Sequence, residues 1–252
     1  MSPRLQAVAD AMATTALQQT AEKSGFRCVP VSLRCGATGK QWLCPQRGVA
    51  LSVERAVLSH FEREGWRGYW GEGGLLLTLI KAMSFRELDY DQRTRYIEAL
   101  YTLAADAKYD MSYTVDDLLG NLRTATAAQV ARNFDHMNSR GPFHETAERF
   151  TSSDSTSLQD NWPGLARWMV LELLEVAGHD LLHRIASTFA SNPYDFRRGW
   201  PDITMWKDGQ LRFVEVKAPG DKIVSSQKVI ASAFARPLEL DFCLATVTVQ
   251  QA

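Results

Sequence analysis

The sequence predicts an α/β fold in which helices flank a mixed β-sheet. Residues 203–206 and 211–216 are short β-prone runs, and Asp208-Gly209 between them is a strong hairpin signal. Residues 240–249 are strand-like, with Phe242, Leu244, Thr246 and Thr248 alternating with Cys243, Ala245 and Val247, and they predict a further strand that closes the sheet. Segments with helical periodicity precede the hairpin and separate it from the last strand. The order is helix, helix, insertion, helix, hairpin, helix, strand.

The helices are predicted from their apolar spacing and their end signals. Residues 52–64 begin at Ser52, a good N-cap, and Gly65 ends that helix. An apolar run at 75–83 follows a glycine-rich turn. Residues 162–175 and 179–190 form two helices separated by Gly178. Ser225 and Ser226 are expected to cap a helix at 227–235.

The chain divides into two parts by composition. Residues 1–50 combine a helical stretch at 5–22 with an irregular segment, and we interpret them as an N-terminal extension or small subdomain. Residues 51–252 are predicted to form the main domain. Within it, residues from about 85 to about 160 are mostly helical and polar, which indicates a helical insertion.

The overall charge excludes a strongly basic protein. The 252-residue chain has a net charge of −1, yet residues 179–236 hold nine Lys and Arg against six Asp and Glu. A nucleic-acid-binding protein needs only such a local basic region. The four cysteines form no C-x-x-C pair, and no secretory signal or membrane-length apolar run is present. We therefore expect a cytoplasmic or nucleoid-associated protein with no membrane partner.

The candidate catalytic residues lie around the predicted hairpin. Pro201-Asp202 precede its first strand, and Glu215-Val216-Lys217 end its second. Alternate residues of a strand share a face, so Glu215 and Lys217 project together, and the hairpin returns them beside Asp202. One interpretation is a surface hairpin with a solvated salt bridge. The other is the PD-(D/E)xK pattern of metal-dependent nucleases.

The residue types suit metal-assisted hydrolysis. Carboxylates of Asp202 and Glu215, with the backbone carbonyl of Val216, are the oxygen ligands that Mg²⁺ or Mn²⁺ prefers. A bound metal lowers the pKa of its water and polarises a phosphoryl oxygen. Lys217 would orient that water or neutralise charge in the transition state.

The flanking residues sharpen this interpretation. Arg197-x-Gly199-x-Pro201-Asp202-Ile203 and the later Val214-Glu215-Val216-Lys217-x-Pro219-x-Asp221-Lys222-Ile223, with Gln227, together resemble the VRR-NUC nuclease family. Ala218 and Val224 depart from the pattern, which has Gly and Ser there. The resemblance implies a restriction-endonuclease-like core, and it implies that Gln227 helps to order the site.

A second resemblance adds a carboxylate. Ser52-Val53-Glu54, Gly65-Trp66 and Gly71-Glu72-Gly73 resemble the nuclease domain of the Fanconi-associated nucleases, the larger VRR-NUC relatives. In that family the glutamate of G-E-G binds metal. The resemblance thus implies that Glu72 joins Asp202 and Glu215 as a catalytic metal ligand. The alternative is that Glu72 only complements the dipole of the helix that follows.

Four basic residues near the pattern are candidate DNA contacts. Arg197 and Arg198 precede the hairpin, and arginine suits bidentate phosphate contacts. Lys222 and Lys228 flank Gln227 and are further candidates for phosphate binding. Ordinary surface charge is the alternative for each.

These observations predict a metal-dependent DNA endonuclease that cuts branched or 5′-flap DNA, with 5′ exonuclease activity left open. Short viral members of the family lack the insertion and pair as dimers on four-way junctions, so by analogy the insertion indicates a monomer acting on flaps. Two alternatives are a dimeric Holliday-junction resolvase and a non-catalytic nucleic-acid-binding module.

Overall fold

The computed structural model describes residues 16–36, 41–88, 97, 101, 113–139 and 157–250. The first fifteen residues of the predicted extension, and much of the predicted insertion, lie outside these ranges. The chain forms two compact units. Unit 1 comprises residues 1–72, 199–207 and 211–252, and unit 2 comprises residues 73–198 and 208–210. Among the described residues, no helix has the length and apolar character required to cross a membrane.

After a helical segment at residues 16–24, the elements are β1 (Arg27–Leu33), β2 (Trp42–Leu43), β3 (Ala50–Leu51), α2 (Val53–Glu62), β4 (Arg67–Trp70), α3 (Gly74–Ser84), α5 (Val115–Leu122), α6 (Ala127–Asn138), α7 (Leu158–Asn161), α8 (Arg167–Ser191), α9 (Pro193–Phe196), β5 (Ile203–Lys207), β6 (Gln210–Lys217), α10 (Ser225–Ile230), the π-helical turn η3 (Ala231–Ala235) and β7 (Asp241–Val249).

Unit 1 is built on a mixed five-stranded sheet in the order β1-β7-β6-β5-β4. β4 and β5 are antiparallel, whereas β7 runs parallel to both of its neighbours. β5 and β6 are joined by the predicted turn, where Asp208 and Gly209 both adopt positive φ. The predicted mixed sheet with flanking helices is therefore confirmed.

The outer edge of the sheet differs from the sequence prediction. β7 was expected to close the sheet, but it is an inner strand, and β1 pairs with it in parallel from Arg27↔Cys243 to Leu33↔Val249. The segment that supplies this edge lies in the predicted N-terminal extension, so residues 27–33 are part of the sheet. Residues 27–33 form one continuous strand, which pairs with a strand more than 200 positions away.

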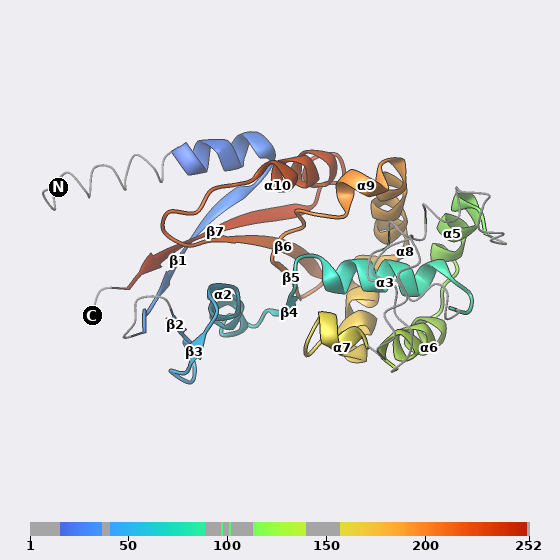
Figure 1. Ribbon diagram of the computed structural model, residues 1–252, viewed down its shortest axis with the longest axis horizontal. Coiled ribbons are helices and arrows are strands. Elements are labelled where there is room, and N and C mark those ends of the chain that lie inside the picture. Colours follow the sequence, from blue (N-terminus) through green and yellow to red (C-terminus); the bar gives the residue numbers. More distant parts are fainter. Residues whose placement is uncertain are drawn as a thin grey trace, which may run out of the picture. The chain divides into compact units, whose positions relative to one another are not determined.

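The two faces of the sheet are covered by different helices. Figure 1 shows α2 and α10 on opposite faces. Against α2, buried Val214 and Val216 of β6 join one apolar core with Ala56 and Phe61. The other face is aromatic, and Trp200 packs on Phe234 of η3 with 4.7 Å between ring centroids. Because side chains alternate along β6, Glu215 and Lys217 lie on this second face.

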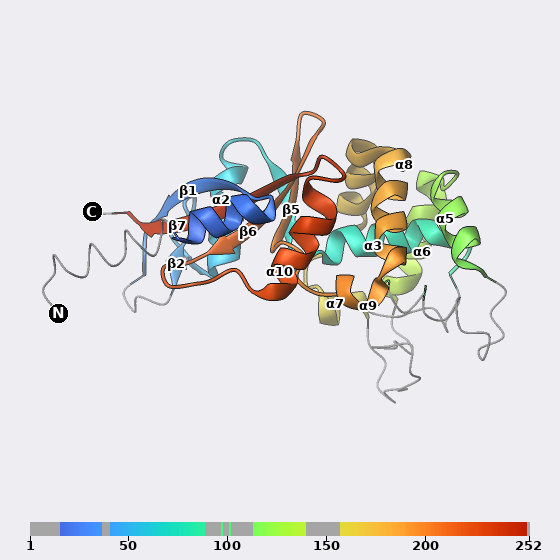
Figure 2. The ribbon, with the colours of Figure 1, turned by 90° about the horizontal axis from the view of Figure 1, so that it is seen from above.

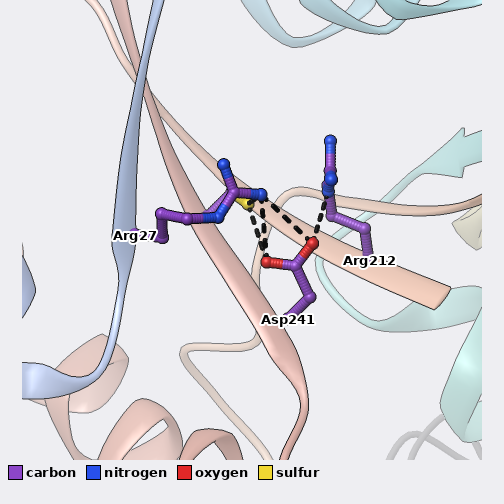
Figure 3. A network of polar contacts seen from close by, with 4 residues as sticks. Arg27, Arg212 and Asp241 are labelled. Carbon is purple, nitrogen blue, oxygen red and sulfur yellow. Dashed lines mark hydrogen bonds and ion pairs between the residues drawn. The ribbon is translucent and has the colours of Figure 1, made fainter. Parts of the chain in front are cut away.

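A polar network joins three strands near their starts (Figure 3). Asp241 of β7 accepts from Arg27 of β1 at 3.1 Å and from Arg212 of β6 at 2.6 Å. The guanidinium of Arg212 also lies over the ring of Trp66, 4.2 Å from its centroid. Although burial opposes the shift, hydrogen bonds from Arg212 and from the Cys243 thiol, with the charges of both guanidiniums, hold the pKa of the Asp241 carboxyl below its ordinary value. The network therefore cross-links β1, β7 and β6.

Unit 2 is helical, and α3, α5, α6 and α8 pack on one another (Figure 2). Every residue of α3 is buried. The buried Asn133 of α6 donates to the carbonyls of Ala82 and Phe85, both at 2.8 Å, and so caps the last turn of α3. The predicted break at Gly178 is confirmed, because this residue has non-helical φ and ψ within α8. α8 starts at Arg167 rather than at the predicted Trp162.

Candidate active site

Asp202 lies immediately before β5 and is held by the strand beside it. Its Oδ2 accepts a hydrogen bond of 2.8 Å from the backbone N–H of Val216. Position 199, three residues before Asp202, requires glycine. Its φ is +86°, and a Cβ there would lie 2.4 Å from the carbonyl carbon of Ser226. The chain that leads into Asp202 is thus pressed against the start of α10.

Glu215, Lys217 and Gln227 form a buried cluster on the aromatic face of the sheet. Glu215 is 1% exposed, and its Oε1 lies 2.7 Å from Nζ of Lys217. The same oxygen accepts from Nε2 of Gln227 in α10 at 2.5 Å. The other carboxylate oxygen, Oε2, is buried and has no hydrogen-bond partner among the described residues. One side of this carboxylate is therefore satisfied by the protein, and the other side is not.

The electrostatics follow from this burial. Desolvation raises the pKa of Asp202 to about 6, against the opposing effect of the Val216 N–H. Burial, with the nearby charge of Asp202, raises the pKa of Glu215 to about 8, although Lys217 lowers it. Each carboxyl group would be more stably ionised if a cation stood beside it.

Glu72 occupies a strained turn tied to Asp202. Its φ is +43°, a value that a residue other than glycine rarely adopts. The N–H groups of Gly71 and Glu72 donate to the carbonyl of Asp202, at 2.8 and 3.4 Å, so the two segments continue the β4–β5 pairing past its end. The negative charge of Glu72 raises the pKa of both Asp202 and Glu215.

Glu54 is a further acid that the residue patterns did not single out for a role. Its charge raises the pKa of Asp202, and it stands ahead of Lys217 and Glu72 among the charged groups that act on that carboxyl. Ser52 caps α2 by accepting from Arg55 N, which places Glu54 in the first turn of the helix. A glutamate next to a helix cap was the available signal, and it is ambiguous because such residues commonly complement the helix dipole.

The donor set suits a hard divalent cation. Asp202 and Glu215 offer carboxylate oxygens, and Glu215 Oε2 is a buried acceptor that needs a partner. Across the described parts of the chain, no three His, Cys, Asp or Glu side chains gather closely enough to hold a metal by themselves. The structure thus brings together Asp202, Glu215, Lys217 and Gln227, while Glu72 adjoins them through its backbone. The role of the Val216 carbonyl stays a prediction.

The start of α10 corrects one expectation. Ser225 was predicted to cap this helix, but it is the first helical residue, and the N-cap is Val224. Valine has no side-chain oxygen to cap the helix, and the side-chain contact at this end is made by Gln227, whose Oε1 accepts from the Val224 N–H at 2.9 Å. The amide of Gln227 therefore both begins the helix and holds Glu215. Lys222 and Lys228 are exposed beside it, and their DNA contacts stay predictions.

Arg197 and Arg198 belong to unit 2, where they end its main segment. Arg197 is half-buried, with its guanidinium carbon 3.5 Å from the ring centroid of Tyr194, and Arg198 is exposed. Covalent continuity places them five and four residues before Asp202. Their predicted phosphate contacts are untested.

Comparison with known families identifies the segment that contains the hairpin. Residues 147–248 match the VRR-NUC domain. The C-terminal part of the chain thus resembles a VRR-NUC domain. The matched segment includes Asp202, Glu215, Lys217 and Gln227 and does not reach Glu72. The VRR-NUC resemblance of the sequence is therefore confirmed for the C-terminal part of the chain.

Longer relatives extend the similarity beyond this segment. The chain is 22% identical over 204 residues to a Fanconi-associated nuclease 1 homolog of Schizosaccharomyces pombe, with 77% of this chain and 27% of that protein covered. It is 25% identical over 218 residues to human Fanconi-associated nuclease 1, with 74% and 20% covered. The chain thus spans about a quarter or less of the length of these relatives.

A solved structure shares the fold. The crystal structure of paFAN1 bound to 5′-flap DNA with a two-nucleotide flap and a gap matches with a TM-score of 0.61 and 16% identity. The match covers 90% of this chain and 38% of paFAN1. At this identity the likeness shows a shared fold.

Proposed function

We propose that the chain is a divalent-metal-dependent nuclease that hydrolyses phosphodiester bonds in branched or 5′-flap DNA. The observation that carries the proposal is Glu215, a buried carboxylate with one oxygen held by Lys217 and Gln227 and the other without a partner. A structural ion pair would satisfy both oxygens. A carboxylate that is satisfied on one side only suits a site completed by a cation.

The residues have distinct parts in this proposal. Asp202, Glu215 and Glu72 would hold Mg²⁺ or Mn²⁺, with the Val216 carbonyl as a further oxygen. Such a metal supplies an activated water and polarises the phosphoryl group. Lys217 positions the attacking water and offsets the charge that develops on the phosphate. Gln227 holds Glu215 by its hydrogen bond and so orients the carboxylate.

The substrate class is supported by the relatives. The VRR-NUC match, the similarity to Fanconi-associated nucleases and the shared fold with paFAN1 bound to 5′-flap DNA favour DNA as the partner. We further propose a monomer, since the chain carries a helical unit between Glu72 and Asp202. Light scattering tests this, because a dimer in solution would favour the resolvase alternative.

Cleavage assays with Mg²⁺ or Mn²⁺ on flap, splayed and four-way DNA test the function. We expect Asp202→Ala and Lys217→Ala each to lower the cleavage rate by about 10³-fold or more. DNA binding should persist in both variants. Lys207→Ala is the matched control, because Lys207 lies in the same sheet and its Nζ donates to the carbonyl of Glu64. Full activity of Asp202→Ala would contradict the mechanism. Absence of cleavage by the unaltered chain with either metal would favour the binding-module alternative.

A further inference from the structure

Tyr194 and Arg197 form a stacked pair on the short helix α9. The guanidinium carbon of Arg197 lies 3.5 Å from the centroid of the Tyr194 ring. The two residues are three positions apart, so they share one side of the helix turn. The pair has no place in the hydrolytic cluster, and the sequence patterns did not single out Tyr194.

Tyr194 is unusually open for an aromatic residue. Tyr194 is 68% exposed, which is the highest value among the exposed large hydrophobic residues in the described parts of the chain. Arg197 covers one face of the ring, so the open area is the opposite face and the edges. An apolar ring costs free energy when it stays in water. An exposed flat face of this kind therefore suits a partner that stacks.

The pair is held in place from beneath. Phe196 lies between Tyr194 and Arg197 in the chain and is buried, and its ring centroid is 6.4 Å from that of Phe189 in α8. Pro193 starts the helix. Because Phe196 anchors the turn inward, Tyr194 and Arg197 are presented outward without a large loss of side-chain freedom on binding.

The charge around the ring favours an anionic partner. Within the described residues, neither Arg197 nor Arg198 forms an ion pair with a carboxylate. Asp195, the one acid of the turn, accepts from Asn192 Nδ2 at 2.7 Å. A flat ring stacked on Arg197 and followed in the chain by Arg198, neither of which has a carboxylate partner among the described residues, matches a nucleotide, which combines a stacking base with a phosphate.

Chain continuity sets an upper limit on the distance between the pair and Asp202. Tyr194 precedes Asp202 by eight residues, which span at most about 28 Å even when fully extended. At about 3.4 Å per nucleotide step along one strand, this corresponds to fewer than about nine steps. Gly199, pressed against Ser226, and buried Trp200 further restrict this connection.

We infer that Tyr194 is a stacking platform for an unpaired base of the DNA substrate and that Arg197 and Arg198 bind the adjoining phosphates. This inference rests on the proposed nuclease function for its partner. It adds a contact that recognises single-stranded DNA by its bases. Such a contact tolerates any base sequence, since every base has a face to stack.

The test compares two single-stranded oligonucleotides of equal length, one of them with its bases removed as abasic sites. Fluorescence anisotropy without metal measures their affinity for the full chain, so that no cleavage intervenes. We expect Tyr194→Ala and Tyr194→Leu to weaken binding of the base-bearing strand by about 5- to 100-fold. Tyr194→Phe should retain it, and all four proteins should bind the abasic strand alike.

Trp168→Ala is the matched control, because Trp168 is an exposed aromatic residue of α8 in the same unit. Unchanged binding by Tyr194→Ala, or an equal loss with Trp168→Ala, would overturn the inference. An equal loss in Tyr194→Phe would also overturn it, since the hydroxyl rather than the ring would then be responsible. Cleavage by the unaltered chain is scored separately. The nuclease proposal can thus fail while the stacking result stands, or the reverse.

Discussion

Two carboxylates on neighbouring strands of the sheet have opposite surroundings. Asp241 of β7 is engaged by Arg27 and Arg212 on both oxygens, and its pKa is lowered. Glu215 of β6 has a lysine and an amide on one oxygen, no hydrogen-bond partner on the other within the described parts of the chain, and a raised pKa. Both are acid–base pairs near β6, so ion pairing alone does not mark a functional site.

The two carboxylates differ in whether both of their oxygens have hydrogen-bond partners. The Asp241 network is partly exposed, and both oxygens of the Asp241 carboxylate accept hydrogen bonds, as a cross-link between strands requires. The Glu215 cluster is buried and incomplete. Evolution rarely retains a buried acceptor without a partner unless a ligand completes it. Each prediction below separates these two kinds of carboxylate.

The largest expected difference is in cleavage. Glu215→Gln keeps the volume of the side chain and removes the charge that a metal needs, so we expect loss of cleavage by about 10³-fold or more. Asp241→Asn should leave the rate per folded molecule unchanged. Rates measured with Mn²⁺ on a 5′-flap substrate, normalised to folded protein by circular dichroism, check the pair. Similar losses in both variants would contradict the distinction.

The second difference is in the pH dependence of metal-free stability. The folded-state pKa of Asp202 is about 6 and that of Glu215 about 8, both above the ordinary values of 3.8 and 4.5. The folded chain therefore holds more protons than the unfolded chain across this window, and these groups lose their stabilising contribution as pH rises from about 4 to about 8. Asp241 acts in the opposite sense, because its lowered pKa contributes stability above about 4 that is lost on acidification.

Thermal unfolding in chelator measures both effects. The Asp202→Asn, Glu215→Gln double variant should show a flatter decline in melting temperature between pH 5 and pH 8 than the unaltered chain. Added Mg²⁺ or Mn²⁺ should raise the melting temperature more at pH 8 than at pH 6, since the metal needs ionised ligands. A metal effect that is larger at pH 6 would contradict the assignment of these groups.

The third difference is in stability at neutral pH. Asp241→Ala leaves Arg27 and Arg212 without their shared acceptor, and we expect it to cost about 1–3 kcal/mol. Denaturant unfolding at pH 7 measures this. Arg27→Ala should lower the free energy of unfolding less than Arg212→Ala, because the Arg27 side chain is 54% exposed and the Arg212 side chain is 17% exposed. The reverse ranking would show that the cross-link to β1 is the more important one.

The same contrast explains what could be predicted from the sequence. The hairpin was predictable because its signals are local: the Asp208-Gly209 turn and the alternation of β6 lie within fifteen residues. The convergence of Asp202 with Glu215 and Lys217 follows from that hairpin. The break at Gly178 was predictable for the same reason, since a single glycine interrupts the helical pattern.

Long-range features were not predictable. β1 joins β7 in parallel across more than 200 residues, and neither strand carries a signal that names its partner. β4 is four residues long and contains Gly68, so it resembled a turn rather than a strand. The effect of Glu54 on Asp202 depends on how α2 lies against the sheet. The valine at the N-cap of α10, with its backbone N–H bonded to Gln227, is not indicated by residue preferences.

The smallest effect is expected at Gln227, which provides one of the two contacts to the satisfied oxygen of Glu215. Its amide donates one hydrogen bond to Glu215 and accepts one from Val224. Gln227→Ala removes one hydrogen bond, worth about 1 kcal/mol, that orients the Glu215 carboxylate. Because Lys217 still holds this carboxylate, the cleavage rate should fall only about fivefold. Gln227→Glu should be worse than Gln227→Ala, because it places a second acid against Glu215 and raises its pKa further. If Gln227→Glu cleaved as well as the unaltered chain, the amide would serve only to start α10, and the satisfied side of Glu215 would depend on Lys217 alone.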